Sequence, residues 1–117
     1  MYQNDYNKAL EHIKTSIEVV KDHQNIMRCE QVVLDFSRET AWKCIQDLIY
    51  EYESEIVLFG ALCDGNTIYR NINPNTLSDD ELRRQLVYIA RHIPIYVLMR
   101  KGEEELAKRI CQWIDRR

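Results

Sequence analysis

The chain has 117 residues, of which 45% are hydrophobic and 30% charged, with only three glycines and two prolines. This length predicts one domain, residues 1–117, and the composition excludes collagen-like, linker-like and disordered classes. So few turn-forming residues also argue against a many-stranded sandwich or barrel, which needs a turn every ~8–12 residues. We therefore expect an all-α fold, a single-domain bundle of four to five helices.

Apolar spacing predicts a first helix from about Asp5 to Gln24, with Asp5 as its N-cap. Its inward stripe has intervals of 4, 3, 4 and 3 residues and consists of Tyr6, Leu10, Ile13, Ile17 and Val20. A second segment, 26–36, has similar spacing. It either ends before a new helix capped near Ser37 or continues into that helix, because neither Gly nor Pro interrupts it.

The most regular pattern runs from about Glu39 to Cys63 and predicts the central helix of the bundle. Its apolar positions alternate by three and four residues and are Trp42, Ile45, Ile49, Tyr52, Ile56, Phe59 and Cys63. Gly65 suits the turn that ends this helix. Residues 64–78 then form the one long irregular stretch, in which 67–69 allow a short β-like segment.

Ser78 followed by three acidic residues predicts the start of the next helix. Pro94 predicts a kink or an end near Ile93. The run 95–99 is apolar on both faces, so its pattern does not decide between helix and strand. Gly102 separates it from a last helix that begins near Glu103.

Charge is distributed unevenly along the chain. Residues 1–82 carry a net charge of −8 and residues 83–117 a net charge of +5. Asp47, Glu51 and Glu55 follow each other at intervals of four, so they form an acidic strip on one helix face. This strip is either a docking site for a basic partner or a weak metal site, or it is neutralised by the chain's own basic C-terminal helix. The basic charge available within the chain favours neutralisation.

No motif points to catalysis or to a cofactor. The sequence contains no GxGxxG, GxxxxGKS or HExxH pattern, and its cysteines and histidines lack a known zinc spacing. Arg91 and His92 are adjacent, so on a helix they point about 100° apart and make a poor composite site. We expect neither an enzyme nor a resident cofactor or metal. Nucleic-acid binding by the basic C-terminal third is an alternative, although 103–105 interrupts that basic run with three glutamates.

The cysteines, Cys29, Cys44, Cys63 and Cys111, all lie in or beside apolar segments. We interpret them as reduced, buried side chains in a reducing compartment. The N-terminus lacks the basic and apolar regions of a secretory signal, and no apolar run reaches the ~20 residues that a membrane span needs. These observations predict a cytoplasmic protein without a membrane partner.

Seven tyrosines in a chain of this size exceed what its core can hold. Tyrosine is common at protein interfaces, which favours an intracellular interaction protein: a regulator, inhibitor or adaptor. The predicted partner surface combines Tyr69 and Arg70, in the irregular stretch, with the acidic strip of Asp47, Glu51 and Glu55. The long apolar stripes also predict a homodimer.

Two short segments carry a family resemblance. Tyr6-Asn7-Lys8-Ala9-Leu10 and Phe36 with Thr40-Ala41-Trp42-Lys43 resemble the HEPN-like helical proteins that accompany minimal nucleotidyltransferases. The resemblance covers roughly residues 6–52, and the Arg-x(4–6)-His motif of the ribonuclease members is absent. It implies a helical accessory protein of a nucleotidyltransferase and assigns no site residues.

Overall fold

The computed structural model describes residues 6–60 and 72–116. These residues form six α-helices and one short 3₁₀ helix, and they contain no strand, so the all-α prediction is confirmed with one helix more than expected. In chain order the elements are α1 (Tyr6–Glu18), α2 (His23–Val33), α3 (Arg38–Glu51), α4 (Glu53–Phe59), η2 (Pro74–Thr76), α6 (Asp79–Arg100) and α7 (Glu104–Asp115). Within the same residues, no helix is both long and apolar enough to cross a membrane.

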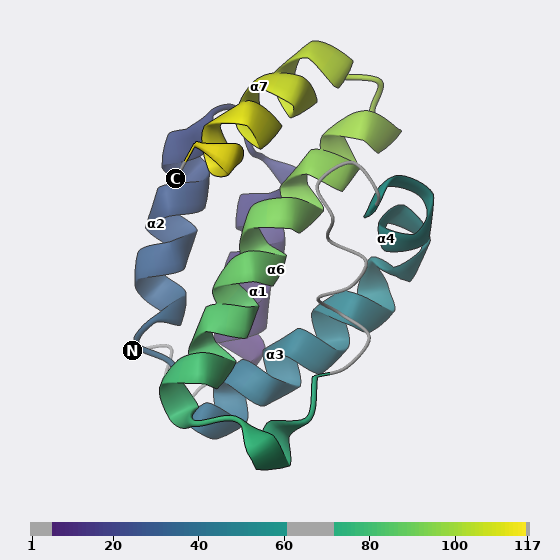
Figure 1. Cartoon of the computed structure of the whole chain (residues 1–117). Coiled ribbons are helices and arrows are strands. Elements are labelled where there is room, and N and C mark those ends of the chain that lie inside the picture. The colour runs from purple at the N-terminus through teal and green to yellow at the C-terminus, as the bar shows by residue number, and fades with distance from the viewer. Residues whose placement is uncertain (1–5, 61–71, 117) are drawn as a thin grey trace.

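Helix α6, and not the predicted helix 39–63, is the central element. It contacts α1, α2, α3, α4 and α7, and it runs through the middle of the molecule (Figure 1). At about 1.5 Å per residue its 22 residues extend roughly 33 Å, close to the longest dimension of the protein, 36 Å. Its second half is apolar on every side, and 92–98 is buried without a break. A helix of that kind must be surrounded by other elements.

Local sequence signals define where three helices begin. Asp22, Ser37 and Ser78 are the N-caps of α2, α3 and α6, and each side chain accepts a hydrogen bond from a backbone N–H of the first turn. Ser78 also forms a capping box, because Glu81 reaches back to the Ser78 N–H at 3.0 Å. Because Ser37 caps a new helix, the second segment ends before α3. The first helix ends at Glu18, not near Gln24.

The predicted helix 39–63 is interrupted at Tyr52. The backbone of Tyr52 leaves the helical region (φ −108°, ψ 22°), so α3 ends at Glu51 and α4 begins at Glu53. The Tyr52 side chain is buried, and its hydroxyl donates a hydrogen bond to Glu18 of α1. Apolar periodicity continues through this position, which is why the sequence did not reveal the break.

Helix α6 does not end near Ile93, one of the two outcomes that Pro94 predicted, because it continues to Arg100. Proline inside a helix costs about 3 kcal/mol through the missing N–H and the clash with the preceding turn. Pro94 is buried together with Ile93 and Ile95, so tertiary packing holds the segment helical. The run 95–99 is therefore helix, not strand.

Arg38, at the start of α3, fixes the segment that leads into α6. Its guanidinium donates to the carbonyl oxygens of Pro74 and Leu77 and to the Asp79 carboxylate. The N-cap predicted at Asp5 and the β-like segment predicted at 67–69 lie outside the described residues.

The turn between α6 and α7 depends on Gly102, whose φ of 81° is in the left-handed region. A Cβ added there would meet no atom within 4 Å, so the strain of a substitution comes from the backbone alone. We predict that Gly102→Ala lowers the free energy of unfolding by about 1 kcal/mol, and that Gly102→Asn lowers it less. Urea unfolding measures both values. Equal effects of Ala and Asn would contradict this explanation.

Candidate functional site

The three residues of the acidic strip differ in exposure and in ion pairing. Asp47 is exposed and makes no ion pair with a described residue. Glu51 is half-exposed and lies 3.2 Å from the Lys14 ammonium group, whereas the Glu55 side chain is only 13% exposed and pairs with Arg100. Tyr69 and Arg70 lie outside the described residues.

Glu55 belongs to a polar cluster, the Glu18 junction, where the ends of α1, α4 and α6 meet. Arg100 donates to Glu55 Oε1 and to Glu18 Oε1, both at 3.0 Å. Tyr52 donates its hydroxyl proton to Glu18 Oε2 at 2.9 Å. Lys101 donates to the Glu18 backbone carbonyl at 2.7 Å. Every charged group of this junction therefore has a partner of opposite charge within the chain.

The protonation states of the Glu18 junction suit a structural role. Burial, together with the hydrogen bond to Glu18, raises the pKa of Tyr52 well above its ordinary value. The hydrogen bond to Glu55 raises the pKa of Arg100. Both groups therefore keep their protons across the physiological range, and neither supplies a proton acceptor for catalysis.

The structure thus shows neutralisation within the chain for two of the three strip residues. Glu55 is neutralised by Arg100, which lies in the last turn of α6 and not in the C-terminal helix that the sequence favoured. The cation beside Glu51 is Lys14, which comes from the first helix and not from the C-terminal one. The sequence could not distinguish these sources, because it does not show which helix packs beside α3.

We predict different effects of two charge-removing substitutions in this strip. Glu55→Gln leaves Arg100 with one carboxylate partner and should lower the free energy of unfolding by about 1 kcal/mol. Asp47→Asn removes an exposed, unpaired charge and should change it by less than about 0.5 kcal/mol. Urea unfolding at pH 7 measures both. Equal destabilisation by the two variants would contradict the assignment of Glu55 to the junction.

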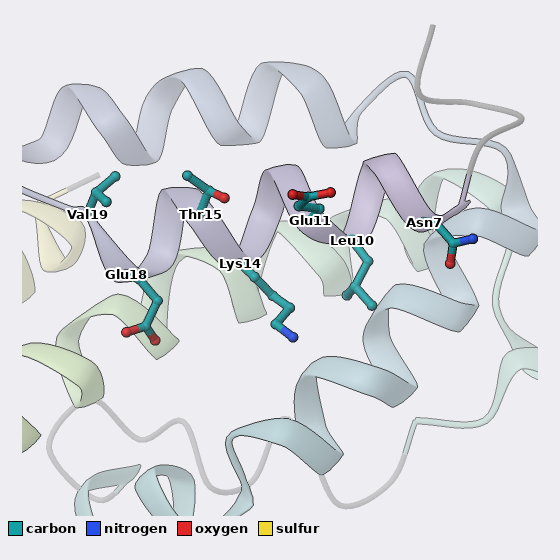
Figure 2. Close-up of a pocket in the computed structure, with 7 residues that line it drawn as sticks. All are labelled: Asn7, Leu10, Glu11, Lys14, Thr15, Glu18 and Val19. Atoms are coloured by element: carbon teal, nitrogen blue, oxygen red, sulfur yellow. The ribbon is translucent and has the colours of Figure 1, made fainter.

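A groove of about 540 Å³ runs along the outer face of α1 (Figure 2). Its described lining consists of Asn7, Leu10, Glu11, Lys14, Thr15, Glu18 and Val19. Lys14 and Glu18 already pair with Glu51 and Arg100, and this lining contains no histidine or cysteine. Over the described residues, no group of three His, Cys, Asp or Glu side chains is placed to hold a metal ion. The described lining of the groove therefore offers contact surface.

A second surface, the α3–α4 face, carries exposed apolar side chains. Tyr50, Val57 and Leu58 are 82%, 70% and 72% exposed. Asp47 precedes Tyr50 by three residues on α3, and Ser54 precedes Val57 by three residues on α4, so an exposed polar residue lies beside an exposed apolar one on each helix. The sequence contained this signal: these positions lie opposite the buried stripe that includes Ile45 and Ile56. Sequence reasoning followed the buried stripe and missed Val57 and Leu58.

Arg91 and His92 do not form a composite site. Arg91 donates to both carboxylate oxygens of buried Glu30, at 2.9 and 3.4 Å, and its guanidinium lies over the Tyr88 ring. His92 is buried, and its Nδ1 lies 2.7 Å from the Tyr88 carbonyl oxygen, which implies that Nδ1 carries the proton and donates. The principal partners differ, Glu30 for Arg91 and the Tyr88 carbonyl for His92, although both side chains also contact the Tyr88 ring.

Burial lowers the pKa of His92, and the nearby charge of Arg91 lowers it further, although the Tyr88 carbonyl and Asp115 oppose the shift. The unfolded chain therefore binds a proton more readily than the folded one. The stabilisation that comes from keeping His92 neutral in the folded protein is fully present above about pH 6.5, the ordinary pKa of histidine. It is lost as the pH falls toward the lower pKa of His92 in the folded protein.

We predict that the free energy of unfolding falls between pH 6.5 and pH 5.5, and that His92→Leu reduces this slope. Urea unfolding of both proteins at several pH values measures the two slopes. Identical slopes would show that other groups cause the acid sensitivity.

The cysteines only partly follow the sequence interpretation. Cys29 and Cys44 are free and buried, and burial raises the pKa of both thiols to about 12. Cys111 is disulfide-bonded, so the expectation that all four cysteines are reduced is wrong for Cys111. Cys63 lies outside the described residues. Sequence spacing does not show which cysteines meet in space, and this is why the expectation failed.

The exposed surface of α7 is basic. Lys108, Arg109 and Arg116 are exposed and make no ion pair with a described residue. Arg109 also borders a hollow of about 150 Å³ beside the start of α2, where the His23 ring stacks on Trp113 at 4.9 Å. The chain's own carboxylates therefore neutralise only part of the basic charge in the C-terminal third.

Comparison of the chain with family models, with curated proteins and with solved structures found no match. The resemblance to HEPN-like proteins therefore still rests on the two segments quoted above. These segments lie beside each other in the structure, because the Lys43 ammonium group is 5.7 Å from the centre of the Tyr6 ring.

Proposed function

We propose that this protein is a non-enzymatic regulator, inhibitor or adaptor that acts by binding another protein. The observation that carries the proposal is the exposure of Tyr50 in the last turn of α3 and of Val57 and Leu58 in α4. Single exposed apolar residues are ordinary, but several on one face are typical of interaction sites.

The state of the candidate nucleophiles supports a non-enzymatic role. Cys29 and Cys44 are buried with raised pKa values, so little reactive thiolate forms near neutral pH. His92 is buried and its Nδ1 is engaged with a backbone carbonyl. The proposal therefore includes no cofactor and no metal.

Affinity purification with chemical crosslinking tests the proposal. Val57→Ser/Leu58→Ser removes apolar surface from the α3–α4 face. Met27→Ser/Leu34→Ser changes two exposed apolar residues of α2 and its C-cap, 43% and 47% exposed, and serves as the control. We expect the natural chain and the control to recover the same protein, and the Val57/Leu58 variant to lose it.

Recovery of no protein by the natural chain, or equal recovery by all three chains, would contradict the proposed function. Recovery of a nucleotidyltransferase would support the accessory role that the HEPN-like resemblance implies. Circular dichroism of each variant checks that the fold is intact.

Self-association is also part of the proposal, but the apolar stripes no longer support it. The stripes that predicted a homodimer pack against the core of one chain, where Ile13, Ile17 and Ile45 are buried and Leu10 and Trp42 partly buried. A dimer would have to form through another surface. Sedimentation equilibrium distinguishes a 14.1 kDa monomer from a dimer.

A cytoplasmic location is also part of the proposal, and the cysteines give opposing indications about it. The free thiols of Cys29 and Cys44 agree with a reducing compartment, whereas the disulfide of Cys111 is unusual there. Rapid acid trapping of thiols in intact cells, followed by mass spectrometry, reports the redox state of Cys111. Complete oxidation in cells would contradict the cytoplasmic location.

Nucleic-acid binding is the second candidate function, favoured by the unpaired cations of α7. If it is correct, Lys108→Gln/Arg109→Gln should weaken binding to a single-stranded RNA, and added salt should weaken it steeply. Absence of RNA binding at low salt would exclude this candidate.

A further inference from the structure

We propose that the α3–α4 face binds a basic amphipathic helix of a partner protein. This inference rests on the proposed function, because it names the kind of partner that the exposed face accepts.

The dimensions of the face suit a helix. Its apolar groups begin at Tyr50 in the last turn of α3 and continue to Val57 and Leu58 in α4. The face spans the break at Tyr52, with Asp47 and Tyr50 one turn apart on α3 and Ser54, Val57 and Leu58 within about one turn on α4. A helical segment with apolar residues at intervals of three and four would present a matching stripe.

The charge around these apolar groups is predominantly acidic. Asp47 and Glu53 are exposed and make no ion pair with a described residue, and Glu51 is only partly neutralised by Lys14. Lys43 lies one turn before Asp47 on α3, and its ammonium group is directed over the Tyr6 ring. Lysine and arginine flanking the partner's apolar stripe would complement this arrangement.

The same charges exclude two other occupants of this face. A two-fold dimer through the α3–α4 face would bring the carboxylates of Asp47 and Glu53 on one copy toward those on the other, and like charges repel. An anionic membrane surface would repel them in the same way. A basic partner is the occupant that both the apolar and the charged groups favour.

Two synthetic 15-residue peptides provide the test. One carries leucine at intervals of three and four residues with lysine elsewhere, and the other replaces each lysine by glutamate. Fluorescence anisotropy with the full chain measures their affinities, and ¹⁵N NMR shift changes locate the binding site. We expect only the basic peptide to bind, with shifts at Tyr50, Val57 and Leu58, and its binding should weaken as salt rises.

Two variants and two controls then separate the contributions of apolar and acidic groups. We expect Val57→Ser/Leu58→Ser to weaken binding of the basic peptide about tenfold or more. Asp47→Asn/Glu53→Gln should weaken it severalfold and reduce its salt dependence. Leu34→Ser and Asp35→Asn change exposed residues at the end of α2 and should have no effect.

Equal binding of both peptides, shifts confined to another surface, or full binding by the Asp47/Glu53 variant would each overturn the inference. So would the absence of binding by the basic peptide. If the purification described above still recovers a partner through Val57 and Leu58, the proposed function stands and only the basic helix is wrong. If no partner is recovered either, both fail.

Discussion

The complete burial of residues 92–98 in α6 is the constraint on which the rest of the fold depends. Residues 92–98 present apolar side chains in every direction, together with His92, and all of them are buried. No single neighbouring helix can cover such a cylinder, so α1, α2, α3, α4 and α7 are arranged around it. This arrangement also keeps Pro94 in a helical conformation, because the packing on all sides outweighs the missing hydrogen bond.

The polar contacts of the core occur where the outer helices meet α6. On one side Glu30 of α2 receives both hydrogen bonds from Arg91, and the pair is largely buried. A buried carboxylate without such a partner would cost several kcal/mol, so this pair fixes how α2 lies against α6. At the other end, the Glu18 junction connects α1 and α4 to the last turn of α6. These contacts orient the outer helices more than they add to net stability.

The interruption at Tyr52 connects the core to the surface that we propose as functional. Because Tyr52 turns inward to Glu18, α4 starts in a new direction, with Ile56 in the core and Glu55 beside Arg100. The opposite side of the same short helix leaves Val57 and Leu58 in contact with solvent. The exposed apolar groups are therefore a consequence of how the core is closed. Because Val57 and Leu58 are not part of the core, their side chains are available to a partner.

The sequence alone determined the helical class, the cap at Ser78 and the inward stripes, because each depends on residues within a few positions of one another. It also placed Arg91 and His92 on different sides of one helix. The structure decided between the two alternatives at Ser37 in favour of a new helix. Only the tertiary structure decided that α6 is central, that Tyr52 divides α3 from α4, and that Lys14 rather than a C-terminal residue meets Glu51. Likewise, only the structure paired Glu30 with Arg91, 61 positions apart. The physical reason is the same in each case: periodicity reports which side of a helix is apolar, whereas the neighbour that covers that side is selected by packing between residues far apart in the chain.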